Sequence, residues 1–172
     1  VRPDRPPGEW ASDKDQFVEL YMPSDKPGRT YELIPGASGD CFDCVHPSET
    51  KYSRTTITVN SLGFRGPERD VEKPPGVKRI VILGGSNTFG ISVSDEDTLS
   101  VQLELVLNSA HPGRFEVWNA GLNAYVTSQK LLYAKEIIAR HSPDILLFQL
   151  SNIGPRPFFY RDKSLGERFR LD

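Results

Sequence analysis

The sequence predicts an α/β protein whose second half forms a doubly wound parallel sheet. Within Arg79–Leu83 lies a continuous apolar run, which is typical of a central parallel strand buried on both faces. Two further strand-like runs follow, Phe115–Trp118 and Ile145–Leu150, each after a helix-like stretch. A β-α-β-α-β order implies right-handed crossovers, so we expect three adjacent parallel strands with Arg79–Leu83 in the centre.

The two helices between these strands are predicted from apolar spacing and from their ends. We expect the first to be capped by Ser94 or Asp95, to carry acids in its first turn, and to end at His111. The second runs from about Thr127 to Arg140 and ends before Pro143. Their apolar faces are predicted to hold Leu99, Leu103, Val106 and Leu107 in the first helix, and Leu131, Ala134 and Ile138 in the second.

The first half of the chain has a different texture, which divides the sequence into three parts. Residues 1–30 are rich in Pro, Asp, Lys and Gly and are predicted to be an extended N-terminal arm. Residues 31–76 form an extension of loops and strands, in which the β-branched run Thr55–Val59 predicts a strand. The α/β domain occupies residues 77–172.

Composition excludes some classes of partner. The formal net charge is −2 and the basic residues are scattered, so no nucleic-acid partner is expected. No stretch approaches the roughly 20 apolar residues of a membrane-spanning helix. Because the sequence starts at Val1, membrane association is expected only through a removed anchor or a partner. No residue pattern indicates a cofactor or a metal.

Cys41 and Cys44 form a lone C-x-x-C in a loop-like stretch. Val45 separates the second cysteine from His46, which excludes a haem attachment site. A zinc site would need a second pair of ligands, and a redox-active pair would need a strand before it and a helix after it. We therefore expect a local disulfide in an oxidising compartment, or two free thiols.

Chemistry is expected at the carboxyl edge of the parallel sheet, where three segments meet. These are Gly84–Gly90, Asn119–Ala124 and Ser151–Gly154. The first places Ser86 after Gly84 and Gly85, in a turn that exposes a hydroxyl. The others offer backbone N–H groups and an Asn amide, the donors that acyl transfer needs. A P-loop and a dinucleotide fingerprint are excluded by spacing, but an esterase serine and a plain turn both remain open.

Several motifs, in order, closely resemble bacterial SGNH hydrolases (GDSL-type esterases), which are often exported or membrane-anchored. They are Asn60–Gly66, Arg79–Gly90, Val117–Gly121 and Pro143–Leu147, and the resemblance covers about residues 55–155. It implies a flavodoxin-like, three-layer sheet, incomplete on its C-terminal side, with Ser86 as the nucleophile. It also implies an oxyanion hole from the backbone N–H groups of Ser86 and Ala124 and the side chain of Asn152. Gly84, Gly85 and Gly90 would shape the serine turn.

The sequence departs from the family pattern at several points. Gly85 replaces the usual Asp before the serine, Ala124 replaces a glycine, and Ile153 replaces the Asp after Asn152. The family's catalytic Asp-x-x-His lies downstream of the third strand, and no histidine follows residue 141 here. His46, His111 and His141 are predicted to be surface or helix-terminal residues, with His141 at the opposite edge of the sheet from Ser86.

Two functions of different class remain open. The first is a serine ester hydrolase acting on acyl or acetyl esters outside the cytoplasm, in the periplasm or at a membrane, with its His and Asp absent from these residues. The second is an inactive SGNH-like structural or binding subunit of a larger assembly. In both, the apolar third strand must be covered, by another protein chain or by further C-terminal residues. This chain alone is predicted to be inactive, because a serine hydroxyl without a base is a poor nucleophile.

Overall fold

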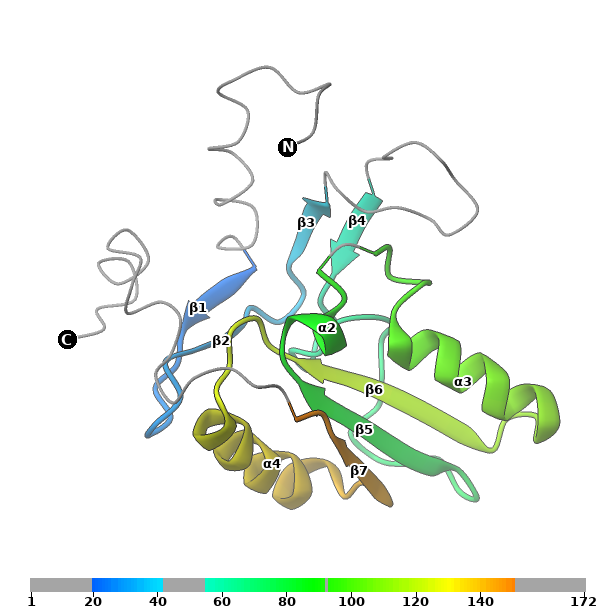
Figure 1. Cartoon of the computed structure of the whole chain (residues 1–172). Helices are drawn as coiled ribbons and strands as arrows, with labels where there is room; N and C mark the ends of the chain where they lie inside the picture. The colour runs from blue at the N-terminus through cyan, green and yellow to red at the C-terminus, as the bar shows by residue number, and fades with distance from the viewer. Residues whose placement is uncertain (1–19, 42–54, 92, 151–172) are drawn as a thin grey trace.

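The computed structural model describes residues 20–41, 55–91 and 93–150, which form a mixed α/β fold (Figure 1). Its sheet contains β5 (Lys78–Gly84), β6 (Phe115–Gly121) and β7 (Ile145–Phe148) in the order β6-β5-β7. Both pairings are parallel, with Leu83 opposite Ala120 on one side and Phe148 on the other. The prediction of three parallel strands with the first one central is therefore confirmed.

One helix covers each face of this sheet. The side chains of β5 alternate between the two faces, as in any strand. Ile80 and Ile82 belong to a small core that packs against α3 (Leu99–Ala110). Val81 and Leu83 belong to the main core, which includes residues of α4 (Thr127–His141). This is the arrangement that right-handed crossovers in opposite directions produce.

The start of α3 differs from the prediction. The N-cap is Thr98, not Ser94 or Asp95, so the acidic residues precede the helix and none lies in its first turn. Ser94 donates its hydroxyl hydrogen bond to Asp97 at 2.7 Å. Asp95 accepts from the backbone N–H of Thr58 at 2.8 Å. The Asp95 carboxylate, which was predicted to cap the helix, therefore binds the backbone of Thr58 instead.

The buried face of α4 also differs from the predicted stripe. Ala134 is buried, but Leu131 and Ile138 are 53% and 56% exposed. The helix is rotated so that several polar side chains face inward. Its buried residues are Gln129, Lys130, Tyr133, Ala134, Ile137 and His141. Each of these polar side chains reaches a partner or an aromatic neighbour on another element, which the apolar spacing alone does not encode.

Two antiparallel pairs precede the parallel sheet. β1 (Tyr21–Pro23) pairs with β2 (Tyr31–Leu33), and β3 (Ser38–Cys41) pairs with β4 (Thr55–Thr58), which is the strand predicted in this half. Leu20 is 1% exposed and packs into the main core. From residue 20 onward, the segment predicted to be an extended arm is therefore part of the folded unit.

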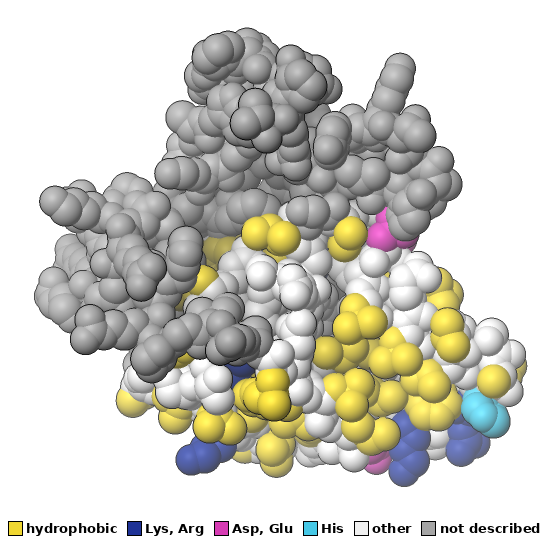
Figure 2. All heavy atoms as spheres, in the orientation of Figure 1, with side chains coloured by type: hydrophobic (Ala, Val, Ile, Leu, Met, Phe, Trp, Pro, Cys, Tyr) yellow, Lys and Arg dark blue, Asp and Glu magenta, His cyan; other side chains and the backbone are white. Residues whose placement is uncertain are grey.

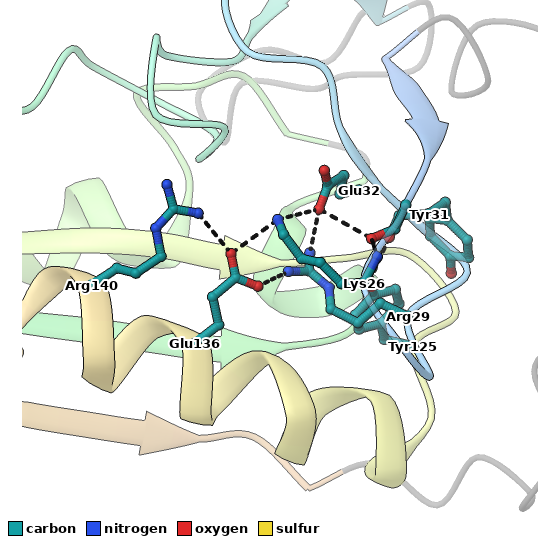
Figure 3. A network of polar contacts seen from close by, with 8 residues as sticks. Lys26, Arg29, Tyr31, Glu32, Tyr125, Glu136 and Arg140 are labelled. Atoms are coloured by element: carbon teal, nitrogen blue, oxygen red, sulfur yellow. Dashed lines mark hydrogen bonds and ion pairs between the residues drawn. The ribbon is translucent and has the colours of Figure 1, made fainter.

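Ion pairs attach the β1–β2 hairpin to α4 (Figure 3). Lys26 Nζ lies 2.7 Å from Glu32 and 3.0 Å from Glu136 of the helix. The guanidinium of Arg29, which is 5% exposed, contacts both carboxylates and stacks 4.0 Å above the ring of Tyr133. Since these charges are partly or fully desolvated and satisfied by one another, they fix the hairpin in one position on the helix.

The β7 side of the sheet carries exposed apolar side chains. Leu146 and Phe148 pack against the main core. Ile145 and Leu147, which alternate with them, are 45% and 41% exposed. Figure 2 shows hydrophobic side chains gathered over α3 and the neighbouring part of the sheet. β7 pairs only with β5 among the described strands, so its other edge has no strand partner there.

Candidate functional site

Ser86 lies at the carboxyl end of the central strand. It is the first residue of α2 (Ser86–Phe89), a single helical turn that follows β5 directly. Gly85 is the N-cap and Gly90 the C-cap, the latter with a φ of 85°, in the left-handed region that favours glycine. The N–H of Gly90 donates to Ser86 O at 2.9 Å. Ser86 is half-buried, at the end of the sheet where β5 and β6 both finish (Figure 1).

Two glycines are required for this turn to pack. A Cβ atom on Gly84 would overlap the side chains of Thr88 and Gln149. A Cβ atom on Gly121, at the end of β6, would overlap the backbone of Phe89. The second restriction is the more severe, because backbone atoms cannot move aside as a flexible side chain can. The glycines thus allow α2 to lie directly against the ends of the two strands.

Gln149, just after β7, holds the serine turn from the other side. Its Oε1 accepts a hydrogen bond from the Thr88 hydroxyl at 2.7 Å and from the Gly85 N–H at 3.3 Å. Thr88 is 1% exposed, so this hydroxyl depends on a protein partner. Gly85 and Thr88 lie on either side of Ser86 in the chain. The ends of β5 and β6 and the residue after β7 therefore all contribute to the position of the serine.

The loop after β6 is the second part of the site. Asn119 accepts from the Gly121 N–H at 2.9 Å, and the Leu122 N–H donates to Gly84 O at 3.1 Å, which places this loop beside the serine turn. Ala124 has a φ of 58°, a left-handed conformation that costs a non-glycine residue about 1–2 kcal/mol. Strain of this kind often marks functional loops.

Asn123 is an unusual residue of the same loop. Its side chain is 8% exposed, and neither the amide nitrogen nor the amide oxygen has a hydrogen-bond partner in the described structure. The backbone of Asn123 is held by two tyrosines, since its N–H donates to the Tyr21 hydroxyl at 3.3 Å and its carbonyl accepts from the Tyr31 hydroxyl. The two buried amide atoms are therefore an exception to the usual pairing of buried polar groups.

A buried amine lies at the same edge. Lys130 is 1% exposed, and its Nζ donates to Gln149 O at 3.3 Å. Burial lowers the pKa of this amine below its ordinary value. No motif surrounds Lys130, and it stands between polar residues and leucines at the start of α4, so its burial could not be predicted from the sequence.

The described histidines lie away from Ser86. His111 is exposed and follows α3. His141 ends α4, and its carbonyl accepts from Arg79, at the start of β5, at 2.7 Å, which places it at the opposite edge of the sheet as predicted. Contrary to expectation, His141 is 8% exposed, and burial, followed by the charges of Arg140 and Arg79, lowers its pKa. His141 is helix-terminal, as predicted, but it is buried. Its surroundings favour the neutral imidazole, so the prediction that its positive charge is favourable is wrong.

A cavity of about 300 Å³ lies near His141, not at the serine. Its walls come from the β1–β2 hairpin, the turn at residues 61–64 and α4, and include Arg29, Leu62, Tyr133 and Arg140. Ser86 does not line it. This cavity is therefore separate from the edge of the sheet at which the chemistry is predicted.

Several predicted residues lie outside the described part of the chain. They are Asn152, His46 and Cys44, together with the side chain of Cys41. The oxyanion role of Asn152 and the pairing of the two cysteines stay predictions. The spacing Asp-x-x-His does occur upstream, at Asp43–His46, also outside the described residues.

In the described ranges, no group of three His, Cys, Asp or Glu side chains is placed to hold a metal ion. None of the helices in those ranges is both long and apolar enough to cross a bilayer. Comparison of the chain with protein-family models and with curated proteins finds no match.

Proposed function

We propose that this chain contains the serine-bearing part of an SGNH-type ester hydrolase with a flavodoxin-like sheet. Ser86 is the nucleophile, and the backbone N–H groups of Ser86 and Ala124 and the side chain of Asn152 stabilise the oxyanion. The observation that carries the proposal is the serine turn itself. A half-buried serine begins a helical turn at the end of the central parallel strand, against glycines that leave the backbone close.

The backbone at Ala124 gives independent support. The family resemblance aligns this residue with a glycine, and its φ of 58° lies in the region that glycine adopts without strain. The residue departs from the family pattern, but its backbone keeps the conformation that a glycine there would serve. The alignment of Asn119–Ala124 with the family's second motif is therefore consistent with the local geometry.

The alternative function is an inactive SGNH-like structural or binding subunit. Two observations favour it. Neither described histidine lies at the carboxyl edge beside Ser86, and β7 exposes Ile145 and Leu147 where a partner chain or further C-terminal residues could pack. In either case we place the protein outside the cytoplasm, in keeping with the exported proteins that the motifs resemble; a disulfide between Cys41 and Cys44, if it forms, would agree with this location.

Ester hydrolysis tests the proposal. We expect the 172-residue chain to hydrolyse p-nitrophenyl acetate only slowly, because oxyanion donors without a triad leave an acceleration of about 10³–10⁴ over water. Ser86→Ala should change that slow rate little, whereas in a longer protein with a downstream Asp-x-x-His block it should abolish turnover. Ser109→Ala, on the exposed face of α3, is the matched control and should have no effect in either protein.

Two results would contradict these expectations. Rapid, Ser86-dependent turnover by the 172-residue chain would show that it already contains a base. Full activity of Ser86→Ala in the longer protein would reject Ser86 as the nucleophile and favour the structural alternative.

A further inference from the structure

The motif Asn60–Gly66, which precedes the parallel sheet, folds into a turn organised by its first residue. Asn60 Oδ1 accepts from the N–H groups of Leu62 at 3.1 Å and Phe64 at 3.0 Å, and its Nδ2 donates to Pro67 O at 2.9 Å. Gly63 has a φ of 82°, which a side chain would disfavour. The turn thereby fixes the direction of the backbone at Arg65, which follows Phe64.

Arg65 reaches from this turn to the far end of the serine helix. Its backbone forms bridges to Val59 and Asn119, and its side chain is completely buried. The guanidinium Nη1 donates to Phe89 O at 2.8 Å and also to Gly90 O. The Nη2 atom donates to Val93 O at 2.7 Å. These carbonyls belong to the carboxyl end of α2 and the loop after it.

A carboxylate balances the buried charge. Arg65 Nε lies 2.8 Å from Asp95 Oδ1. Burial lowers the pKa of Arg65, and Asp95 acts in the opposite direction. An arginine in such a setting stays protonated, because its ordinary pKa is far above neutral pH. The positive charge therefore faces the carboxyl end of α2, where the helix dipole is negative.

The contacts connect Arg65 to Ser86 without touching it. Arg65 binds the carbonyls of Phe89 and Gly90, and the N–H groups of the same two residues donate to Gly85 O and Ser86 O, both at 2.9 Å. One short hydrogen-bonded unit thus runs from the guanidinium to the residue at the helix start. A single isolated helical turn is unstable by itself, so its ends must be held by tertiary contacts.

We propose that Arg65 is a positioning residue for Ser86, which it acts on by binding the Phe89 and Gly90 carbonyls and so keeping the helical turn closed. The inference rests on the proposed function only in taking Ser86 as the reacting group. It assigns a role to the Asn60–Gly66 motif, which delivers the guanidinium to the serine turn.

The test places a thiol at the serine, in the full 172-residue chain. In Ser86→Cys, the pKa of the thiol follows from the pH dependence of its alkylation by iodoacetamide, read by peptide mapping so that Cys41 and Cys44 do not interfere. Adding Arg65→Met removes a nearby positive charge and loosens the turn whose N–H groups favour the thiolate. Both effects raise the thiol pKa. We expect a rise of about half a unit, hence about threefold slower alkylation at pH 7.

Arg79 offers a matched control. It is equally buried, is paired with Glu116, and stacks on Trp118 at 4.1 Å, but it lies at the opposite end of β5. Arg79→Met in the Ser86→Cys background should lower the free energy of unfolding and leave the thiol pKa unchanged. Arg65→Lys, which keeps the charge but cannot bind three carbonyls and a carboxylate together, should give a smaller rise than Arg65→Met.

An unchanged thiol pKa in folded Arg65→Met would overturn the proposal and leave Arg65 with a purely structural role. If Arg65→Met does not fold, Arg65→Lys decides in the same way, with far-UV circular dichroism as the check on folding. The thiol measurement needs no ester turnover. A raised thiol pKa with no Ser86-dependent hydrolysis in the longer protein therefore rejects the esterase function and keeps the positioning role of Arg65. An unchanged thiol pKa with Ser86-dependent hydrolysis keeps the esterase function and rejects the positioning role.

Discussion

Removing the Gln149 amide should destabilise the protein by an amount that depends on Thr88. Gln149→Leu deletes the acceptor that serves the Thr88 hydroxyl at 2.7 Å and the Gly85 N–H at 3.3 Å. Because Thr88 is 1% exposed, its hydroxyl is left buried without a partner, which costs about 1–3 kcal/mol. Thr88→Val removes the donor but keeps the volume and leaves the Gly85 bond in place, so we expect a loss of about 1 kcal/mol.

The double variant separates this interaction from other effects of each change. Once the hydroxyl is absent, Gln149→Leu no longer strands it, so the double variant should lose about 1 kcal/mol less than the sum of the singles. Urea unfolding, followed by circular dichroism with equal m-values, measures all four proteins. Gln102→Leu, on the exposed surface of α3, is a control expected to change stability by less than about 0.5 kcal/mol. Additivity within about 0.5 kcal/mol would refute the buried hydrogen bond.

Two further predictions concern packing and pH. Gly121→Ala should lower the free energy of unfolding by about 3 kcal/mol or more, because its Cβ meets the Phe89 backbone. Gly113→Ala, where nothing lies within 4 Å, should lower it only by the strain of a φ of 68°, about 1–2 kcal/mol. Equal losses in urea unfolding would contradict the overlap at Gly121. Since the folded pKa of His141 lies below 6.5, the unfolded chain binds the extra proton, and stability should fall as pH drops below about 6.5, by at most about 1.4 kcal/mol per unit. His141→Gln should reduce this loss between pH 7.5 and 5.5, and exposed His111→Gln should not; a pH dependence that His141→Gln leaves intact would show that another group causes it.

The strands of the parallel sheet could be predicted because each signal is local. Ile80–Leu83 and Ile145–Phe148 are apolar runs between polar turns, and their order along the chain is enough to fix right-handed, parallel neighbours. The β1–β2 hairpin could not be predicted in this way. Its strands are three residues long, and Tyr21 and Tyr31 owe their burial to a loop about a hundred residues away.

The same distinction separates the site residues that were predicted from those that were missed. Ser86 stands where a strand ends in two glycines, which any reader of the sequence can find. Gln149 and Arg65 contact the serine turn across separations of 61 and 24 residues. No pattern marks Gln149, and the Asn60–Gly66 motif contains Arg65 without indicating what its side chain contacts. His141 was misjudged because its environment is set by Phe64 and Trp118, whose rings lie 5.2 and 5.3 Å away, not by its place at a helix end.

The attachment of the β1–β2 hairpin to α4 has a consequence for how the protein is made. The Tyr125 hydroxyl, which donates to Tyr31 O, is separated from it by 94 residues, and Arg29 is separated from Glu136 by 107. At about 5–20 residues per second, a ribosome takes roughly 5–20 s to synthesise the chain between such partners. Tyr31 and Leu33 emerge first and must wait that long with their apolar surfaces exposed. In cell-free translation, where no export competes with folding, nascent chains halted before residue 125 should therefore bind chaperones through this hairpin, and chains extended past α4 should release them.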